Sequence, residues 1–186
     1  AILLWIAVCV FRADGDHART MQQIGLGVLG LVWIAWFLGH WTLILFMADG
    51  RRWSIFLLLV VTGNDTFAYV VGSLFGRRPL TPAISPNKTV EGALGGVAGG
   101  VLGGALAALW LPWFQLEVPL AHVLILSALL ALAGQLGDVV ESLVKRWAGA
   151  KHSGACLPGH GGLLDRLDSL LLTPPLLYYY ITLAGL

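Results

Sequence analysis

Long apolar runs separated by short polar stretches set the pattern of this chain. Most of the runs reach the roughly 20 residues with which an α-helix crosses a hydrocarbon core of about 30 Å. The predicted spans are 24–47, 54–75, 92–111, 120–141 and 163–186, and residues 1–11 form a partial span. We therefore predict an all-α fold, a polytopic integral membrane helical bundle of about five full transmembrane helices plus an N-terminal partial helix.

Composition agrees with this interpretation. The 186 residues are 58% hydrophobic and 11% charged, whereas soluble domains have about 25% charged residues. Too few polar side chains are present to cover a soluble globule of this size, which excludes the soluble classes of protein. The two cysteines, Cys9 and Cys156, have no metal-ligand spacing and are interpreted as free thiols.

Lysine and arginine gather in alternate loops. Only Arg51 and Arg52 lie on one side of the predicted bundle. The other side has Arg12, Arg19, Arg77, Arg78, Lys88, Lys145, Arg146 and Lys151. The positive-inside rule places this second side, with loops 76–91 and 142–162, in the cytoplasm. The assignment assumes that each apolar run crosses the membrane once.

Small residues and prolines mark two of the spans. Glycines recur every four residues from Gly92 to Gly104, with a neighbouring stripe from Gly95 to Gly103. Such stripes let helices approach closely in lipid, either within one chain or across a dimer seam. In the last span, Pro174 and Pro175 lack backbone donors and predict a kink.

Charged residues inside the spans are candidates for function, because each costs at least about 2.5 kcal/mol to insert. Asp65 lies near the middle of a span, where it would either serve a site or lock helices by pairing with a basic residue. Asp138, Glu141 and Lys145 share one helical face. This face could belong to a site or could be an ion-pair ladder at the membrane edge.

The sequence DRLDS places Asp165 and Asp168 on one face of a helix, where carboxylates can hold a hard cation such as Mg²⁺. In SPNKTVEG, residues 85–92, hydroxyls and Lys88 precede a glycine-rich helix and could bind phosphate. A plain helix-capping loop would contain similar residues. In PGHGG, residues 158–162, glycines flank His160 and allow a ligand to approach closely.

The stretch from Ser142 to Asp168, SLVKRWAGAKHSGACLPGHGGLLDRLD, closely resembles the signature of the phosphatidate cytidylyltransferase (CDP-diacylglycerol synthase) family. Residues 64–92 resemble the other polar region of that family, so the resemblance covers about residues 60–175. One position departs from the pattern: His152 stands where the family usually has aspartate. Histidine is a poor substitute for a carboxylate on a hard cation, but a loop position that tolerates the change is an equal alternative.

The resemblance implies the reaction of CTP with phosphatidic acid to give CDP-diacylglycerol and pyrophosphate, with Mg²⁺ as cofactor and a second cation as an option. Asp138 and Asp165 are expected to hold the principal metal, with Asp168 or Asp65 assisting. Asp165, Asp138, Lys145 and His160 are the expected catalytic residues. The expected substrate-binding residues are Ser85, Lys88, Glu91, Lys145, Arg146, Lys151, His160 and Arg166.

The same resemblance sets expectations for partners and location. We expect CTP, phosphatidic acid and membrane lipids as partners, no nucleic acid, and a homodimer as a possible assembly. Residues 1–186 would form a single transmembrane catalytic domain that lacks N-terminal helices of a longer protein. The expected location is the bacterial inner (plasma) membrane, with the active site facing the cytoplasm.

Two other functions would use similar residues. A CTP-dependent lipid-alcohol kinase of the polyprenol type would share nucleotide, metal and membrane but transfer the γ-phosphoryl group. A cation transporter would also place carboxylates inside several spans. The segment PGHGGLLDRLD argues against both, since it matches the signature of the cytidylyltransferase and an ion pathway has no need of a triphosphate site.

Overall fold

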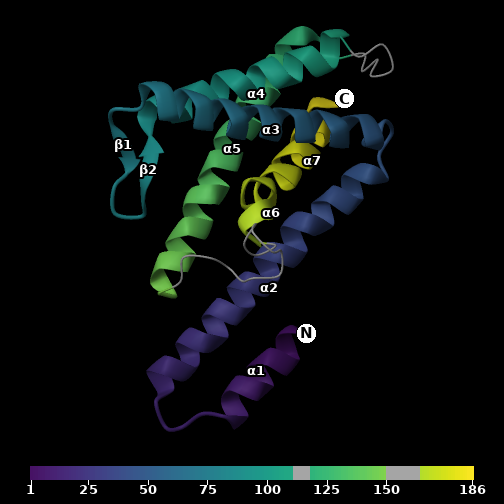
Figure 1. Ribbon diagram of the computed structural model, residues 1–186. Coiled ribbons are helices and arrows are strands. Elements are labelled where there is room, and N and C mark those ends of the chain that lie inside the picture. Colours follow the sequence, from purple (N-terminus) through teal and green to yellow (C-terminus); the bar gives the residue numbers. More distant parts are fainter. Residues whose placement is uncertain (111–117, 150–163) are drawn as a thin grey trace.

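The computed structural model describes residues 1–110, 118–149 and 164–186. Its helices are α1 (Ile2–Phe11), α2 (His17–Leu45), α3 (Gly50–Phe75), α4 (Val90–Trp110), α5 (Leu120–Trp147), α6 (Leu164–Leu171) and α7 (Thr173–Ala184). Two short strands, β1 (Pro79–Thr81) and β2 (Ser85–Thr89), lie between α3 and α4. The helical membrane bundle predicted from the sequence is therefore confirmed (Figure 1).

Within the described residues, four helices are long and apolar enough to cross a membrane, namely α2, α3, α4 and α5. Helix α5 continues to Trp147, beyond the predicted end at residue 141. Its last turns are polar but are stabilised as helix by an ion pair between Glu141 and Lys145, four residues apart. Residues that the sequence placed in a loop thus stand on the same rigid helix as Asp138.

The last predicted span, 163–186, is divided into two short helices. Helix α6 ends at Leu171 and α7 begins at Thr173, with prolines in its first turn. Proline fits the first turn of a helix but cannot continue a preceding one, because it has no backbone N–H. The predicted kink is confirmed, and the division explains why four long spans are found where about five were predicted.

The predicted loop 76–91 contains a β-hairpin. Strands β1 and β2 pair antiparallel, with Pro79 opposite Thr89 and Thr81 opposite Ser85. The N–H of Ile84 donates to the carbonyl of Thr81 at 3.1 Å and closes the turn. The hairpin projects from the ends of α3 and α4, beside α5 (Figure 1).

Helices α3 and α4 lie side by side along their length (Figure 1). A Cβ atom on Gly99 or Gly103 would come within 2.6 Å of a backbone oxygen of α3, and one on Gly100 within 2.9 Å of Ala131 in α5. Both glycine stripes therefore allow close packing within the chain. This confirms the interpretation of the stripes as internal packing.

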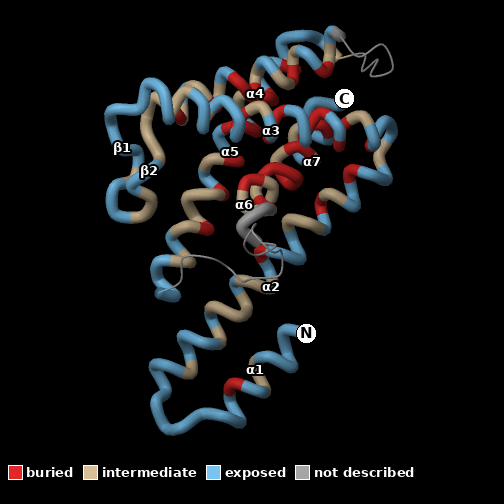
Figure 2. Tube along the Cα trace, viewed as in Figure 1, coloured by how far each residue is buried: buried red, intermediate tan, exposed pale blue. Residues whose placement is uncertain are grey.

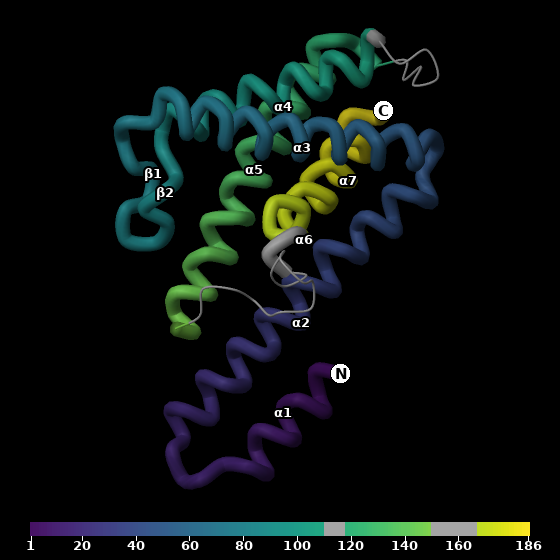
Figure 3. Tube along the Cα trace, viewed as in Figure 1, coloured from purple at the N-terminus to yellow at the C-terminus, as the bar shows by residue number. Residues whose placement is uncertain are grey.

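The main core lies where α3, α5 and α7 meet the C-terminal end of α2. Its largest fully buried side chains include Phe56, Ile44, Leu130 and Leu177. Figure 2 shows buried residues concentrated in this region, whereas α1 and the first half of α2 are mainly exposed. Figure 3 shows that the C-terminal helices α6 and α7 return to lie against α2 and α5. This return brings a carboxylate oxygen of Asp168 within 4.8 Å of one of Asp138.

Candidate active site

A cavity of about 480 Å³ lies between α3, the hairpin, α4, α5 and α6. Small residues such as Ala68, Gly72 and Gly92 form part of its wall. Its polar lining consists of Asn64, Asp65, Ser73, Asn87, Lys88, Thr89, Gln135, Asp138, Asp168 and Ser169. Three of the predicted metal-binding aspartates thus face one space, together with one predicted substrate-binding lysine.

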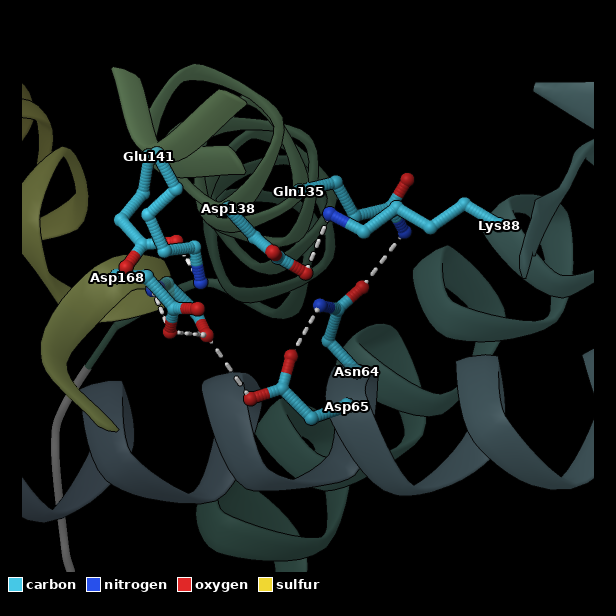
Figure 4. Close-up of polar contacts among 9 residues, drawn as sticks. Asn64, Asp65, Lys88, Gln135, Asp138, Glu141 and Asp168 are labelled. Carbon is cyan, nitrogen blue, oxygen red and sulfur yellow. Dashed lines mark hydrogen bonds and ion pairs between the residues drawn. The ribbon is translucent and has the colours of Figure 1, made fainter. Parts of the chain in front are cut away.

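Three carboxylates gather on one side of this region. Asp138 and Glu141 come from α5 and Asp168 comes from α6, and one oxygen from each lies within 4.8 Å of the others (Figure 4). Carboxylate oxygens in such a group are suitable ligands for Mg²⁺, a hard cation. The donor set therefore fits the predicted metal, although it includes Glu141, which the sequence did not assign as a ligand.

Two lysines pair with this cluster. The Lys88 Nζ atom, from β2, lies 2.6 Å from Asp138 Oδ2, and Lys145 Nζ lies 2.5 Å from Glu141 Oε2. Glu141 is 0% exposed, so its charge is removed from bulk solvent. The Glu141–Lys145 pair matches the ion-pair ladder that the sequence offered as the alternative to a site on this helical face. Asp138 instead pairs with Lys88 on the hairpin, outside its own helix. Lys88 lines the cavity beside Asp138, where an anionic group of a ligand would meet it.

Asp65 belongs to a network of neutral hydrogen-bond donors. Its carboxylate accepts from Asn64 Nδ2 at 3.0 Å and from the Ser169 hydroxyl at 3.1 Å. Gln135 Nε2 in turn donates to Asn64 Oδ1 at 2.7 Å and to the carbonyl of Ala93 at 2.9 Å. Asp65 therefore joins α3 to α6 through the Ser169 hydroxyl, and no ion pair joins it to a basic side chain that the structure describes. The side chain of Arg166 on α6 lies outside the described residues, so the alternative of an ion pair stays a prediction.

Ser169 connects this network to the metal-binding candidates. Its hydroxyl also lies 3.1 Å from Asp168 Oδ1, and its backbone N–H donates to the same oxygen at 2.7 Å. A hydroxyl has a single hydrogen, so it can donate to Asp65 or to Asp168 at one time. The two aspartates are thereby linked through one small side chain (Figure 4).

The hairpin residues have mainly structural contacts. Thr89 Oγ1 accepts the N–H of Gly92 at 3.1 Å, which is the helix-capping interaction considered for this segment. Glu91 Oε2 accepts the backbone N–H groups of Arg77 and Arg78. Among the described residues that line the cavity, Lys88 is present but Ser85 and Glu91 are absent.

Arg146 also contacts the hairpin, because its Nε donates to the carbonyl of Ile84 at 3.2 Å. Other predicted residues cannot be placed. Lys151, His152 and His160 lie outside the described residues, as do the side chains of Asp165 and Arg166, whose backbone forms part of α6. Their roles stay predictions.

Sequence reasoning did not assign Gln135 or Ser169 to this site, and it placed Glu141 on the helical face of Asp138 without assigning it as a ligand. Gln135 lies three residues before Asp138 and Glu141 three residues after it, so all three share the helical face that the sequence had already marked. Ser169 directly follows Asp168. Extending the marked face by one turn would have found Gln135.

Comparisons with known proteins show which family this chain resembles. The model of the cytidylyltransferase family matches residues 1–184. The phosphatidate cytidylyltransferase of Bacillus subtilis (strain 168) is 39% identical over 184 residues, which cover 98% of this chain and 66% of that protein. The Staphylococcus haemolyticus enzyme of the same name is 45% identical over 130 residues, 70% of this chain and 49% of that protein. The chain therefore spans between about half and two thirds of the length of these relatives.

Proposed function

The chain belongs to the cytidylyltransferase family, and we propose that it carries the catalytic part of a phosphatidate cytidylyltransferase. The reaction joins CTP to phosphatidic acid and yields CDP-diacylglycerol and pyrophosphate. The observation that carries this proposal is the group of Asp138, Glu141 and Asp168 with two lysines paired to it. Asp138, Asp168 and Lys88 also line the cavity between the helices. The relatives named above bear the same enzyme name.

The chemistry needs alignment and neutralisation of charge more than a strong base. A phosphate oxygen of phosphatidic acid attacks the α-phosphorus of CTP, a new P–O bond forms, and the bond to the β-phosphate oxygen breaks to release pyrophosphate. The attacking oxygen is already anionic, so no proton has to be removed from it. Positioned cations lower the barrier by stabilising the negative charge that both substrates bring together.

Asp138, Glu141 and Asp168 would hold Mg²⁺ through their oxygens, with Asp165 and Asp65 as further candidates. Bound there, the cation would supply Lewis-acid stabilisation of the phosphate oxygens. Lys88 and Lys145 lie beside these carboxylates and would exchange part of their pairing for contacts with phosphate oxygens. Lys151, His160, Arg146 and Arg166 remain proposed contacts of the triphosphate, and Ser85 of a head group.

We place the site at the cytoplasmic face of a bacterial inner membrane. The support is the gathering of basic residues in loops 76–91 and 142–162 and the bacterial source of the relatives. A lipid substrate would reach the cavity from the bilayer, while CTP would enter from the cytoplasm. A homodimer, if formed, would use a surface other than the glycine stripes of α4, since these pack inside the chain.

Purified protein in detergent, supplied with labelled CTP, Mg²⁺ and phosphatidic acid, tests the proposal. We expect labelled CDP-diacylglycerol and an equal amount of pyrophosphate, and we expect a chelator to abolish both. Absence of CDP-diacylglycerol would refute the cytidylyltransferase assignment. Transfer of the γ-phosphoryl group to a polyprenol, or cation flux in liposomes without lipid product, would instead support the kinase or the transporter.

Asp138 of the carboxylate cluster and Asp165, which the sequence also assigned to the metal, can be tested separately. We expect Asp138→Asn and Asp165→Asn each to abolish turnover while the protein keeps its helical content and its elution volume in detergent. Near-normal turnover in either variant would remove that residue from the metal site.

A further inference from the structure

Lys88 reaches the carboxylate cluster from a hairpin that has little hydrophobic support of its own. Most of the residues in β1 and β2 are exposed or half-buried, and the two strands comprise three and five residues. A two-stranded hairpin of this size is at best marginally stable by itself. The position of Lys88 over Asp138 therefore depends on contacts that fasten the hairpin to the helices.

Glu91 provides such a contact at the base of the hairpin. Its Oε2 accepts the backbone N–H of Arg77 at 3.0 Å and that of Arg78 at 3.1 Å. These two amides follow the end of α3 at Gly76, beyond the hydrogen bonds of the helix. A carboxylate that accepts two backbone N–H groups forms strong, charge-assisted hydrogen bonds. The end of α3 is thus tied to the first turn of α4.

The same junction is closed by other short contacts. Val90 N–H donates to the carbonyl of Arg78 at 2.9 Å, and Gly92 N–H donates to Thr89 Oγ1. A Cβ on Gly92 would lie 2.9 Å from the carbonyl oxygen of Ala68, so the two helices meet closely at this point. Both strands of the hairpin leave from this junction, and its geometry sets their direction.

The hairpin contacts α5 at two points, one near its base and one at its turn. Lys88 Nζ lies 2.6 Å from Asp138, and Arg146 Nε donates to the carbonyl of Ile84 next to the turn. Lys88 is separated from Glu91 by only Thr89 and Val90. A change at the base would therefore displace the lysine with little chain between them to absorb it.

We propose that Glu91 is a positioning residue: it holds the base of the hairpin through the amides of Arg77 and Arg78, and so places Lys88 at the carboxylate cluster. It does not itself contact substrate. The proposal rests on the proposed function, because Lys88 is taken there to meet a phosphate. It gives Glu91 a role other than the substrate contact expected from the sequence, and it agrees with the absence of Glu91 from the described lining of the cavity.

Three variants distinguish this positioning role from a direct contact between Glu91 and substrate. Glu91→Ala removes the acceptor, Glu91→Gln keeps an acceptor oxygen but removes the charge, and Lys88→Met removes the proposed phosphate contact. We expect Glu91→Ala to lower kcat/KM by about 10²-fold, as a misplacement near 1 Å can, and Glu91→Gln to recover most of this loss. Asp49→Asn, which removes an exposed carboxylate at the other end of α3, is the matched control and leaves turnover unchanged.

The double variant gives the decisive comparison. If Glu91 acts through Lys88, Glu91→Ala adds little to the loss already caused by Lys88→Met, because the two effects are not additive. An additional loss of about 10²-fold in the Lys88→Met background would overturn the proposal. So would a Glu91→Gln variant as impaired in turnover as Glu91→Ala but with unchanged hydrogen exchange over residues 77–89, since the charge would then be needed in the reaction and not at the junction.

Hydrogen exchange gives a second measurement that needs no activity. We expect the amides of residues 77–89 to exchange roughly tenfold faster in Glu91→Ala than in the unaltered protein, in line with lost hydrogen bonds to a charged group. Peptides from α5 serve as the internal reference. Unchanged exchange over 77–89 overturns the positioning role even if the protein makes CDP-diacylglycerol. Faster exchange in a protein that makes none would support the positioning role and refute only the proposed function.

Discussion

Substitution of Glu141 by glutamine tests whether the carboxylate cluster binds a divalent cation. The change keeps the shape of the side chain but replaces one carboxylate oxygen by an amide group. Glu141 is 0% exposed and is paired with Lys145 at 2.5 Å. If that pair were its whole purpose, the variant would lose stability in the presence and in the absence of Mg²⁺ alike.

The size of the metal-dependent effect follows from the spacing of the cluster. Two carboxylate charges 4.8 Å apart repel each other by about 3.5 kcal/mol at an effective dielectric constant near 20. A divalent cation relieves this repulsion and is attracted by each charge. Removing one charge therefore reduces both the repulsion that the cation relieves and the attraction that it gains. We expect the affinity for Mg²⁺ to fall at least about tenfold, which is about 1.4 kcal/mol at saturating Mg²⁺.

Thermal unfolding in detergent, with and without Mg²⁺, measures this difference. For a chain of this length 1 kcal/mol corresponds to about 2 to 4 °C, so the Mg²⁺-dependent rise in Tm should shrink by about 3 to 6 °C in Glu141→Gln. Asp49→Asn is the control, because that carboxylate pairs with Arg52 away from the cluster. A full Mg²⁺-dependent rise in Glu141→Gln would refute the assignment of Glu141 as a ligand.

Three further variants address other parts of the site and the fold. Lys88→Met should raise the KM for CTP or lower kcat/KM by at least about tenfold, because the ammonium group that pairs with Asp138 is lost; unchanged kinetics would exclude a phosphate contact. Gln135→Leu should destabilise the protein by about 2 to 4 kcal/mol. The variant lacks the hydrogen bonds from Gln135 to Asn64 and to the carbonyl of Ala93, and the buried Asn64 oxygen loses a donor. An unchanged Tm would contradict this network. Gly99→Ala should destabilise the protein by about 1 to 3 kcal/mol and lower its Tm, because the added methyl group overpacks against α3. Gly30→Ala, whose methyl group would meet no atom within 4 Å, should leave the Tm unchanged, and equal effects would argue against the close approach of α3 and α4.

The sequence predicted the long helices well, because the length and apolarity of a run are sufficient to identify a membrane helix. Helices α2 to α5 correspond to the predicted spans, and the kink before Pro174 lies where the prolines required it. The hairpin was not predicted. Its strands are short and rich in proline, and its register depends on contacts with α4 and α5 that lie elsewhere in the chain.

A site residue could be predicted where its own neighbours in the sequence marked it, and not where its role depends on a contact with a distant segment. Asp138 and Asp168 were found because charged residues in apolar spans are conspicuous. Glu141 was passed over as a ligand because its spacing from Lys145 also fits an ordinary ion pair along a helix. The contact between Lys88 and Asp138 joins β2 to α5, and no local spacing could have indicated it.

The polar network around the cavity also explains how a helix bundle can carry carboxylates at this depth. Asn64 on α3 bonds to Gln135 on α5, which bonds in turn to the carbonyl of Ala93 on α4, while Asp65 accepts from Ser169 on α6. Each bond joins two different elements, and an unsatisfied polar group in lipid costs several kcal/mol. The bonds that satisfy these groups therefore also fix the distances between the helices. Loss of one of these neutral contacts should disturb fold and site together, whereas loss of a charge from the carboxylate cluster should weaken cation binding and leave the bundle in place.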